Sequence, residues 1–586
     1  MASSTDEGRV SKATFGSDVV VDMLQELGIE YVALNPGASY RGLHDSLVNY
    51  SGGRPELILC NHEEIAVSIA HGYGRAAGKP MAAAVHNIVG LLHAATPIYN
   101  AWLDQAGMLV LGGTGPMATE LRRPYIDWIH TALVQGNAVR DYVKWDDQPA
   151  SVESVIDSML RAHQLITTDP KGPVYLCFDA GLQESSLAEP PLLPNPALFE
   201  SPAPPQANPE ALERAADLLT AARNPVALVD YLGNDDSVQG AVRLAETVGM
   251  PVIDGGDLFN FPSDHPLNLT DAAAELLAEA DVVLSLNTYD LEQALTVPGG
   301  TSRAGTVAAA PNAKFIDISL RQLTVRSWGQ IYGKLHPLSI NVLADGGRAA
   351  GALADIVAAR GPVARAYERT ARHSARHAEL RAQARQRAAA SADGGHITRG
   401  YLALQTWEAV KPHDWVLADR DLRGSFAQRL WDVRRAYQFH GTGKAGLGNG
   451  LGRALGVALA NRGTGRLNVH FQPDGDLLFT PSALWTAAHH ELPLLIVMHN
   501  NRSYNNDYAH QMEVAHHRDR PPENAGIGID IGSPDVDFAT VAQGFGVHAE
   551  GAIERPQDLL PAIERAAAYV AAEGKPALVD VVVRER

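Results

Sequence analysis

Short apolar runs alternate with amphipathic segments along most of the chain. Residues 18–28 place apolar side chains at helical spacing, and residues 31–37 form an apolar run that ends in an Asn-Pro-Gly turn. Similar pairs of segments recur through residues 14–185, 210–345 and 396–586. Strands separated by helices form right-handed crossovers on a parallel sheet. The pattern therefore predicts an α/β fold built from consecutive parallel-sheet units.

Two segments of unusual composition separate these units. Residues 189–209 are rich in proline, which removes backbone donors and favours an extended connector. Residues 352–395 are rich in alanine and arginine, and they predict a solvated helical linker rather than a nucleic-acid-binding arm. We therefore expect three consecutive parallel-sheet α/β domains, at residues 1–188, 205–345 and 396–586, with a helical linker at residues 346–395.

The composition narrows the classes of partner. Of 586 residues, 46% are hydrophobic and 20% are charged, and 48 basic against 67 acidic residues give a formal net charge of −19. A protein that binds nucleic acid or an anionic membrane with its whole surface should be basic, so neither partner is expected. An anionic ligand would need a local cation, a metal ion or backbone N–H groups.

The sequence predicts no membrane span, disulfide framework or export signal. It contains no run of 18 apolar residues, and Cys60 and Cys177 are too few for a disulfide framework or a structural zinc site. The first residues are polar and include acids, unlike a signal or transit peptide. We expect a cytoplasmic protein.

The segment with the most specific chemistry spans residues 471–507. An apolar strand ends in Asp474-Gly475-Asp476, a helix-like stretch follows, and the next strand ends in Asn500-Asn501. The carboxyl ends of neighbouring parallel strands lie side by side, so the oxygens of Asp474 and Asn501 are expected to converge. A carboxylate and an amide suit Mg²⁺ that keeps other positions for phosphate, and Gly475 lets backbone N–H groups approach a diphosphate.

This segment resembles the metal motif of thiamine-diphosphate (ThDP) enzymes, GDG followed by NN at the same spacing. The chain departs at the first position, where Pro473 replaces a glycine. The resemblance implies that the Mg²⁺ ligands are Asp474, Asn501 and the carbonyl of Ser503, and that the cofactor contacts include Gly475, Asp476, Asn501 and Tyr504. Around this motif the chain is particularly similar to benzoylformate decarboxylases and, more loosely, to acetolactate synthase-like enzymes.

A second motif lies near the other end of the chain, in residues 60–80. Glu63 stands at a strand-to-helix junction, where the helix dipole by itself favours an acid. ThDP enzymes have an acid there, followed by a helix and a G-Y/F-x-R-x-x-G-K-P sequence. The resemblance implies that Glu63 hydrogen-bonds the aminopyrimidine of the cofactor and activates it by proton transfer. Its neighbour Glu64 is expected to face solvent.

A glycine-rich segment, residues 439–460, contains the sequence GTGKAG, which matches a dinucleotide-binding pattern. That interpretation needs an acid about 20 residues further on, and no Asp or Glu occurs between Gly441 and Pro473. NAD binding is therefore not expected, and Ala445 after Lys444 also argues against a phosphate-binding P-loop. In ThDP enzymes a bulky aliphatic residue in such a turn supports the bent cofactor, and Leu447 resembles that residue.

Residues 82–102 supply a candidate acid–base group. His86 ends a predicted strand and by itself could be a buried, hydrogen-bonded histidine. In benzoylformate decarboxylases a strand ending in histidine leads into a G…NAW sequence, and His86 resembles that proton-transferring histidine; acetolactate synthases have a Gly-Pro-Gly turn there. The preceding loop resembles the decarboxylase substrate loop with Ala38 in place of a serine, and Ser39 or Tyr40 is expected to substitute.

Polar residues after the metal motif bear on the substrate. Asn506, Asp507 and His510 occupy positions where aromatic-acid decarboxylases have apolar pocket residues. Polar groups in a pocket need polar partners, so these residues predict a polar substrate unless they point to solvent from a lid helix. His489 and His490 lie in a helix between strands and are expected to be exposed.

The resemblance spans nearly the whole chain, in the order pyrimidine-binding, central and diphosphate-binding domain. It implies ThDP and Mg²⁺ as cofactors, and the central domain carries no FAD signature. It also implies a homodimer or homotetramer with active sites between subunits. The expected enzyme is a carbon–carbon lyase, a decarboxylase of a polar 2-oxo acid or a lyase of a 2-hydroxy ketone, with an aldehyde as a potential acceptor.

Three alternatives remain open from the sequence. An acetolactate synthase-like carboligase would transfer an acyl or aldehyde unit to a second carbonyl. A non-catalytic protein of the same fold would bind ThDP without needing Glu63. An NAD oxidoreductase is disfavoured by the missing acid after GTGKAG.

Overall fold

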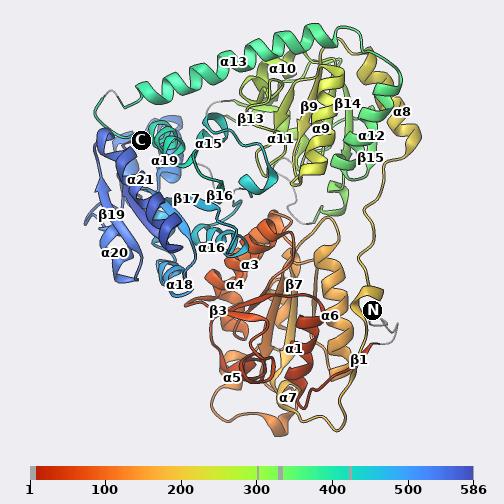
Figure 1. The fold of residues 1–586 in the computed structure, drawn as a ribbon, viewed down its shortest axis with the longest axis vertical. Coiled ribbons are helices and arrows are strands. Elements are labelled where there is room, and N and C mark those ends of the chain that lie inside the picture. Colours follow the sequence, from red (N-terminus) through yellow and green to blue (C-terminus); the bar gives the residue numbers. More distant parts are fainter. Residues whose placement is uncertain are drawn as a thin grey trace.

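The computed structural model describes residues 8–299, 302–326, 331, 334–392, 394–419, 422, 425–441 and 443–584. Three main sheets follow one another along the chain and occupy separate parts of the molecule (Figure 1). Every strand pairing within these three sheets is parallel. We call each sheet with its helices the N-terminal, central or C-terminal unit. The expected class of fold is confirmed, whereas the domain boundaries stay a prediction.

The N-terminal sheet has the order β3-β2-β4-β5-β7-β6. Its strands are β2 (Tyr31–Leu34), β3 (Glu56–Leu59), β4 (Ala82–Ala84), β5 (Leu109–Thr114), β6 (Trp145–Asp147) and β7 (Val174–Asp179). The helices around it are α1 (Gly16–Glu26), α2 (Arg41–Asp45), α3 (Glu63–Ala77), α4 (Ile88–Leu103), α5 (Asp127–His130), α6 (Val152–Thr167) and α7 (Ala180–Glu184). Alternate residues of β7 enter two different cores: Leu176 packs with α1 and α6, and Cys177 packs with α3 and α4. Because both faces of the sheet are covered, its inner strands read as continuous apolar runs.

The central sheet has the order β10-β9-β11-β14-β15. Its strands are β9 (Pro225–Val229), β10 (Val252–Asp254), β11 (Val282–Leu286), β14 (Lys314–Ser319) and β15 (Ile340–Leu343), and β12 (Thr296–Gly299) pairs antiparallel with β13 (Ser302–Val307) in a separate sheet. The helices are α8 (Pro209–Ala221), α9 (Asp235–Val248), α10 (Ala273–Glu279), α11 (Leu291–Ala294) and α12 (Gly346–Ala359). Helix α12 falls in the expected linker, but it packs against α8 and α9 and is part of this core.

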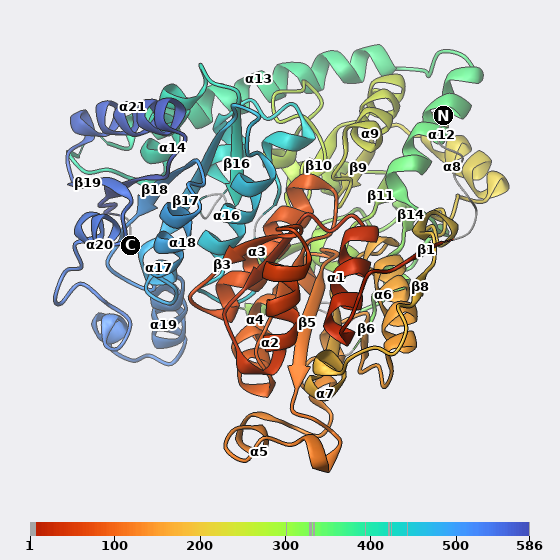
Figure 2. The ribbon, with the colours of Figure 1, turned by 60° about the horizontal axis from the view of Figure 1, so that its bottom comes forward.

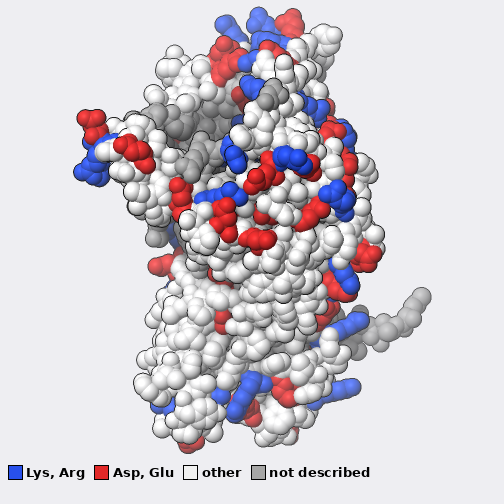
Figure 3. All heavy atoms as spheres, turned by 90° about the vertical axis from the view of Figure 1, so that its left-hand side faces the viewer, with Lys and Arg blue, Asp and Glu red and all other residues white. Residues whose placement is uncertain are grey.

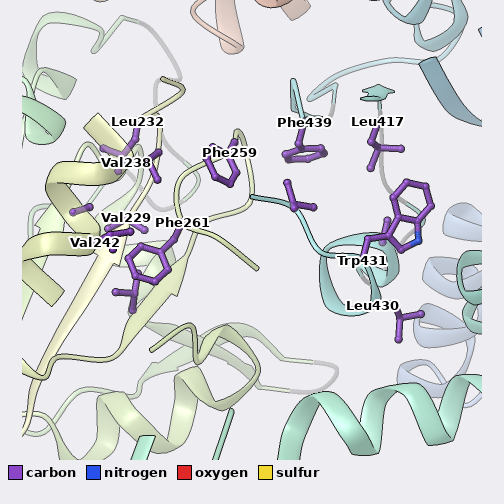
Figure 4. Packing of buried hydrophobic residues seen from close by; sticks show 14 of the residues in the cluster. Val229, Leu232, Val238, Val242, Phe259, Phe261, Leu417, Leu430, Trp431 and Phe439 are labelled. Carbon is purple, nitrogen blue, oxygen red and sulfur yellow. The ribbon is translucent and has the colours of Figure 1, made fainter. Parts of the chain in front are cut away.

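The C-terminal sheet has the order β16-β17-β18-β20-β19. Its strands are β16 (Trp415–Asp419), β17 (Leu467–Pro473), β18 (Leu494–His499), β19 (His548–Ile553) and β20 (Ala577–Val581). The helices are α14 (Arg399–Val410), α15 (Phe426–Leu430), α16 (Gly450–Ala460), α17 (Asp474–Leu477), α18 (Ala483–His489), α19 (Asn505–His517), α20 (Phe538–Gly544) and α21 (Pro556–Glu573). One buried apolar cluster joins this unit to the central one, and Figure 4 shows Phe259 and Phe439 at their junction.

Two connectors differ from each other in character. The proline-rich stretch is irregular apart from a short helical turn and β8 (Leu192–Leu193), which pairs with β1 (Arg9–Val10). Helix α13 (Ala366–Ala390) runs from the central to the C-terminal unit across the top of Figure 1. The helix is solvated along much of its surface, as expected, but Arg369, His373 and His377 are buried and Arg369 donates hydrogen bonds to carbonyls of the central unit. Helix α13 therefore connects the central unit to the C-terminal unit and stabilises their arrangement.

Four of the edge strands were not predicted by the hydrophobic pattern. β3 and β6 border the N-terminal sheet, β15 borders the central sheet, and β19 borders the C-terminal sheet. These strands keep partly exposed positions, as in β6, where all three residues are half-buried. A strand exposed on one side lacks the continuous apolar run by which the inner strands were recognised. In the described part of the chain, no helix combines the length and apolar character that a membrane crossing requires.

The N-terminal and C-terminal units meet along α3 and α16, which lie side by side in Figures 1 and 2. Small residues allow the two helix backbones to approach closely. A Cβ on Gly456 would lie 2.1 Å from the carbonyl oxygen of Ile69 and 2.6 Å from the amide nitrogen of Tyr73. This contact fixes how the start of α3, which carries the Glu63 motif, faces the glycine-rich loop that precedes α16.

We expect Gly456→Ala to destabilise the protein by about 1–3 kcal/mol, the usual cost of overpacking. Alanine favours a helix over glycine, so a loss of stability would come from the clash with α3 and not from helix propensity. Urea denaturation of the full-length protein, followed by tryptophan fluorescence, measures the effect. Gly544→Ala is the matched control, because a Cβ there meets no atom within 4 Å. Equal stability of the two variants would contradict the close packing.

Candidate active site

The first part of the site is a cavity at the carboxyl ends of β17 and β18. In the register of these strands Pro473 is opposite His499, so the residues that follow each strand lie side by side. Asp474 begins α17, and Asn501 follows β18 after one residue. The cavity measures about 210 Å³, and the predicted residues that line it are Leu447, Asp474, Gly475, Asp476, Asn501, Ser503, Tyr504, Asn506 and Asp507. The structure thus brings together residues that the sequence places up to 60 positions apart.

Asp474 is the acid at the base of this cavity and is only 2% exposed. Its carboxylate accepts hydrogen bonds from the backbone N–H of Gly475 at 2.9 Å and of Arg502 at 2.6 Å. Burial nevertheless raises the pKa of Asp474 to about 6, because the backbone hydrogen bonds offset only part of the lost hydration. A cation beside Asp474 would favour its ionised form.

The surrounding polar groups fit a metal ion that carries a diphosphate. The side-chain oxygen of Asn501 accepts a hydrogen bond from the N–H of Ser503 at 3.0 Å, which orients the amide. The buried hydroxyl of Ser503 has no hydrogen-bond partner among the described residues. Arg399, at the start of α14, adds a positive charge to the lining and contributes, after burial, to lowering the pKa of His499 to about 3. Carboxylate, amide and hydroxyl oxygens are the ligands that Mg²⁺ prefers, and arginine suits a phosphate.

The glycine-rich loop before α16 is fastened to this cavity by Asp476. One carboxylate oxygen of Asp476 accepts a hydrogen bond from the N–H of Gly448 at 3.0 Å, and the other accepts one from Gln472 at 3.0 Å. Leu447, one residue before Gly448, is half-buried and lines the cavity. Asp476 therefore sets the position of the aliphatic side chain that the sequence singled out.

Glu64 does not face solvent, and that expectation was wrong. It is half-buried, and its carboxylate lies 3.0 Å from the position that a Cβ of Gly448 would take. Burial, together with the negative charge of Asp476, raises the pKa of Glu64 to about 7. A surface acid was expected because sequence spacing shows only that Glu64 lies in the first turn of α3, and not that this turn abuts the glycine-rich loop.

The second part of the site lies in the N-terminal unit around Glu63. Glu63 is the first residue of α3 and is only 4% exposed, and a carboxylate oxygen lies 3.2 Å from Nδ1 of His93. A Cβ on Gly90 would lie 2.6 Å from Glu63 Oε1 and 2.8 Å from Cβ of His86. Glu63 and His86 therefore border the same small residue, which leaves room for both side chains.

His86 lies beside the hydroxyl of Ser39, one of the two residues expected to substitute for the missing serine. The Ser39 hydroxyl lies 2.9 Å from Nδ1 of His86 and accepts a hydrogen bond from the N–H of Asn87 at 3.2 Å. The Tyr40 hydroxyl instead donates to the carbonyl of Asn35. Burial, followed by the neighbouring His130, lowers the pKa of His86 below its ordinary value, so the imidazole is neutral near pH 7.

Arg123 is a nearby cation that the sequence did not single out. It donates a hydrogen bond of 3.0 Å to the carbonyl of Ala38 and forms an ion pair of 2.7 Å with Asp127. Its positive charge also contributes to the lowered pKa of His86. No spacing rule links residue 123 to residues 38 and 86, so only the folded loop around α5, which projects at the bottom of Figure 2, could reveal this contact.

Several predicted site residues do not share one cavity in the single chain. Ala38, Ser39, Glu63 and His86 are absent from the lining of the cavity that contains Asp474. His510 is exposed on α19 and also lies outside that lining. His490 is not fully exposed as expected, since its Nε2 accepts a hydrogen bond of 2.8 Å from the N–H of Leu59. His489 is exposed, as expected, and stacks on Trp485.

A buried ion network joins the two parts of the site. Arg453 of α16 lies 2.6 Å from a carboxylate oxygen of Asp419 and 3.5 Å from one of Asp104, which is also 3.0 Å from Nε2 of His71. All four residues are at most 5% exposed. Burial acts to raise the pKa of Asp104, but the His71 hydrogen bond and the positive charges around it lower the pKa to about 2. The network therefore holds an ionised carboxylate between the N-terminal and C-terminal units.

Comparison with known proteins agrees with this geometry. Residues 15–135 match the family described as thiamine pyrophosphate enzyme, N-terminal TPP binding domain, and residues 424–581 match its C-terminal TPP binding domain. The chain is 25% identical over 549 residues to benzoylformate decarboxylase of Pseudomonas aeruginosa, which covers 89% of this chain and 91% of the relative. It is 24% identical over 558 residues to the acetolactate synthase isozyme 1 large subunit of Escherichia coli, which covers 93% and 91%.

A solved structure has a similar fold, and this likeness supports the fold alone. The thiamine diphosphate-dependent 4-hydroxybenzoylformate decarboxylase of Rhodococcus jostii aligns with a TM-score of 0.75 at 20% identity, covering 98% of this chain and 99% of that structure. Two TPP-binding domains on three parallel-sheet units define a thiamine-diphosphate-dependent enzyme. The chain belongs to this family. Within it, the chain is a carbon–carbon lyase or carboligase, so the expected family and enzyme class are confirmed and the non-catalytic and NAD alternatives are set aside.

Proposed function

We propose that this enzyme is a ThDP- and Mg²⁺-dependent decarboxylase of a polar 2-oxo acid. The observation that carries the proposal is the meeting of Glu63 and His86 at Gly90, because it joins an acid suited to the cofactor with a neutral imidazole suited to the substrate. The relatives with matching domains include decarboxylases of 2-oxo acids by name. Loss of CO₂ from such an acid needs an electron sink, and the reaction also needs a positioned group that exchanges protons with the substrate.

The cavity of the C-terminal unit would hold the cofactor. Asp474, Asn501 and the carbonyl of Ser503 would bind Mg²⁺, the backbone of Gly475 and the side chain of Tyr504 would contact the diphosphate end, and Arg399 would add a positive charge. Leu447 would support the cofactor from the loop that Asp476 fastens. When bound, ThDP supplies a carbon nucleophile and an electron sink.

The N-terminal unit would supply the proton-transfer groups. Glu63 would address the aminopyrimidine through its carboxyl group, whose pocket is closed by α3 and Gly90. His86 would exchange a proton with the substrate at Nε2, since its Nδ1 faces the Ser39 hydroxyl. Arg123 would hold the substrate loop through the Ala38 carbonyl. Each of these residues would thus act through a group whose position the structure gives.

A polar substrate is supported by the mouth of the cavity. Asn506 and Asp507 begin α19, are exposed and line the cavity next to Tyr504. An apolar aromatic substrate would remove water from these groups without replacing their hydrogen bonds. His510 lies away from the lining and has no part in this proposal.

A second copy of the chain would complete the site. In one chain Glu63 lies outside the lining of the Asp474 cavity, which supports a second copy as the source of one of the two motifs at each cofactor. Large apolar side chains of the N-terminal unit are exposed: Leu92, Tyr99, Met117, Leu121, Tyr125, Trp128, Ile129, Leu133 and Val134. Much of the lower half of the face in Figure 3 is free of charged side chains. Exposed apolar surface of this kind is typical of an interface between subunits, which supports a homodimer or homotetramer.

An acetolactate synthase-like carboligase is the second candidate, favoured by the 24% identity to such an enzyme over most of the chain. A screen of 2-oxo acids by CO₂ release, with and without aldehyde acceptors, tests both. Release of CO₂ with free aldehyde as product supports the decarboxylase. Acetolactate from pyruvate without free aldehyde would overturn it in favour of the carboligase, and no CO₂ from any 2-oxo acid would overturn both.

We expect Asp474→Asn to weaken Mg²⁺-dependent ThDP binding by at least about 10-fold, because a buried carboxylate is replaced by a neutral amide of the same shape. Titration of ThDP at several Mg²⁺ concentrations, followed by circular dichroism, measures the loss. Asp537→Asn is the control, an exposed acid that caps α20 in the same unit. Unchanged Mg²⁺ dependence in Asp474→Asn would contradict the metal site.

We expect kcat/KM to fall at acid pH, on a limb that lies below the ordinary histidine pKa, since His86 must be neutral to accept a proton and its pKa is lowered. His130→Asn removes one of the groups that lower this pKa. The acid limb should then move to higher pH, because protonation of His86 becomes easier. A limb that stays in place or moves to lower pH would contradict the role of His86.

A further inference from the structure

A second cavity lies at the carboxyl ends of the central strands β9, β10 and β11. It measures about 330 Å³ and shares no lining residue with the cavity that contains Asp474. The carboxyl ends of parallel strands are where α/β sheets bind ligands. One lining residue, Lys444, comes from the glycine-rich loop of the C-terminal unit. The cavity therefore joins the central unit to the loop that carries Leu447.

The lining is strongly acidic. The residues that line it include four aspartates, Asp230, Asp254, Asp257 and Asp290, and one lysine, Lys444. Asp230 is only 5% exposed, and its best hydrogen bond is from the N–H of Tyr231 at 2.9 Å. Burial raises the pKa of Asp254 to about 7. A cation bound beside these carboxyl groups would offset the cost of burying their charge and favour their ionised form.

A buried hydroxyl points to a ligand independently of the charges. Thr288, directly after β11, is 5% exposed and lines the cavity. Its hydroxyl has no hydrogen-bond partner among the residues that the structure describes. A buried hydroxyl without a partner is costly, so a ligand with a hydrogen-bonding group would satisfy it.

Lys444 shows which chemistry this cavity recognises. Its ammonium forms an ion pair with Asp257 and lies 5.4 Å from the ring centre of Tyr231 and 6.0 Å from that of Tyr289. The two rings are 6.1 Å apart. A carboxylate combined with two aromatic faces is a recognition site for ammonium and guanidinium groups. The ammonium group of Lys444 thus occupies a site that is suited to a free cation.

We propose that this cavity binds a small organic cation, an alkylammonium or alkylguanidinium, in competition with the ammonium of Lys444. The free cation would pair with Asp257, lie against the tyrosine rings and donate a hydrogen bond to the Thr288 hydroxyl. Its binding would release Lys444 and with it one contact of the loop that carries Leu447. The site is separate from the proposed catalytic residues and does not depend on the proposed reaction.

Titration calorimetry of the full chain with methylguanidinium chloride, at fixed ionic strength, tests the competition. We expect Lys444→Met to bind this probe about tenfold more tightly than the unmodified protein, because a tethered competitor is removed. Lys575→Met is the matched control, since it removes the same charge from an exposed lysine that pairs with Glu491. Equal affinity of the two variants would overturn the proposal.

Two further variants identify the cavity as the place of binding. In the Lys444→Met background, both Asp257→Asn and Thr288→Val should weaken methylguanidinium binding by at least about fivefold, with circular dichroism showing that both variants fold. Butylammonium should compete with the probe, whereas butyrate should not. Binding that survives both substitutions, or binding of butyrate as strong as that of butylammonium, would show that the cavity is not a cation site.

Discussion

Glu63→Gln is expected to lower turnover at least about 100-fold, the usual scale for loss of a general acid–base group. The amide keeps the size of the carboxyl group, so the buried pocket beside Gly90 should stay intact. What is lost is the proton that the carboxyl group can give to the cofactor. ThDP should still bind, because the groups proposed to hold Mg²⁺ and the diphosphate lie in the C-terminal unit.

Two measurements separate this expectation from a structural effect. Turnover is followed with the 2-oxo acid that releases CO₂ fastest, and hydrogen–deuterium exchange at C2 of ThDP reports activation of the cofactor without any substrate. Glu64→Gln is the neighbouring control, since Glu64 lies beside Gly448 and not beside Gly90. Glu63 would lose its assigned role if Glu63→Gln kept normal C2 exchange, or if Glu64→Gln slowed exchange equally.

Arg453→Met is expected to destabilise the protein by about 3–5 kcal/mol, the range for removing one partner of a buried ion pair. Arg453 is 3% exposed and lies between the carboxylates of Asp104 and Asp419. Methionine fills much of the volume but leaves both carboxylates without this cation. Because the pKa of Asp104 is lowered, its stabilisation is present above about pH 4 and is lost as the pH falls toward 2.

Urea denaturation at pH 7 measures this loss at the first unfolding transition. Arg462→Met is the matched control, because Arg462 follows the same helix and its ion pair with Glu56 is exposed to solvent. An exposed pair of that kind contributes at most about 1 kcal/mol. Adding Asp419→Asn to Arg453→Met should restore part of the stability. Losses of similar size in the two arginine variants would refute the proposed network.

The inner strands and two of the functional motifs could be read from the sequence because local patterns determine them. β5 and β18 are buried on both faces, so each is a continuous apolar run. Asp474 and Asn501 converge because each follows one of two neighbouring parallel strands, a relation that their spacing already implies. The edge strand β6 escaped detection because its half-buried residues carry no such pattern.

Contacts between distant segments were beyond sequence reasoning. Glu64 was expected at the surface, yet α3 packs on α16 and brings it beside Gly448. The choice of Ser39 over Tyr40 as the partner of His86 depends on where each hydroxyl points after the turn at residues 38–40. Arg123 reaches Ala38 only because the loop that leads into α5 passes beside the turn at residues 38–40.

The net charge of −19 shows the same difference between what the sequence determines and what the fold determines. The sequence by itself determined the parallel α/β units and the cofactor family, and it supplied the residues proposed to carry the chemistry, since these follow from hydrophobic period and motif spacing. Only the tertiary structure decided where individual charges lie: Arg399 beside the Asp474 cavity, Arg453 between two buried carboxylates, and Lys444 in an acidic pocket of the central unit. The reason is physical, because the energy of a charge depends on its burial and its neighbours, and both are set by the fold.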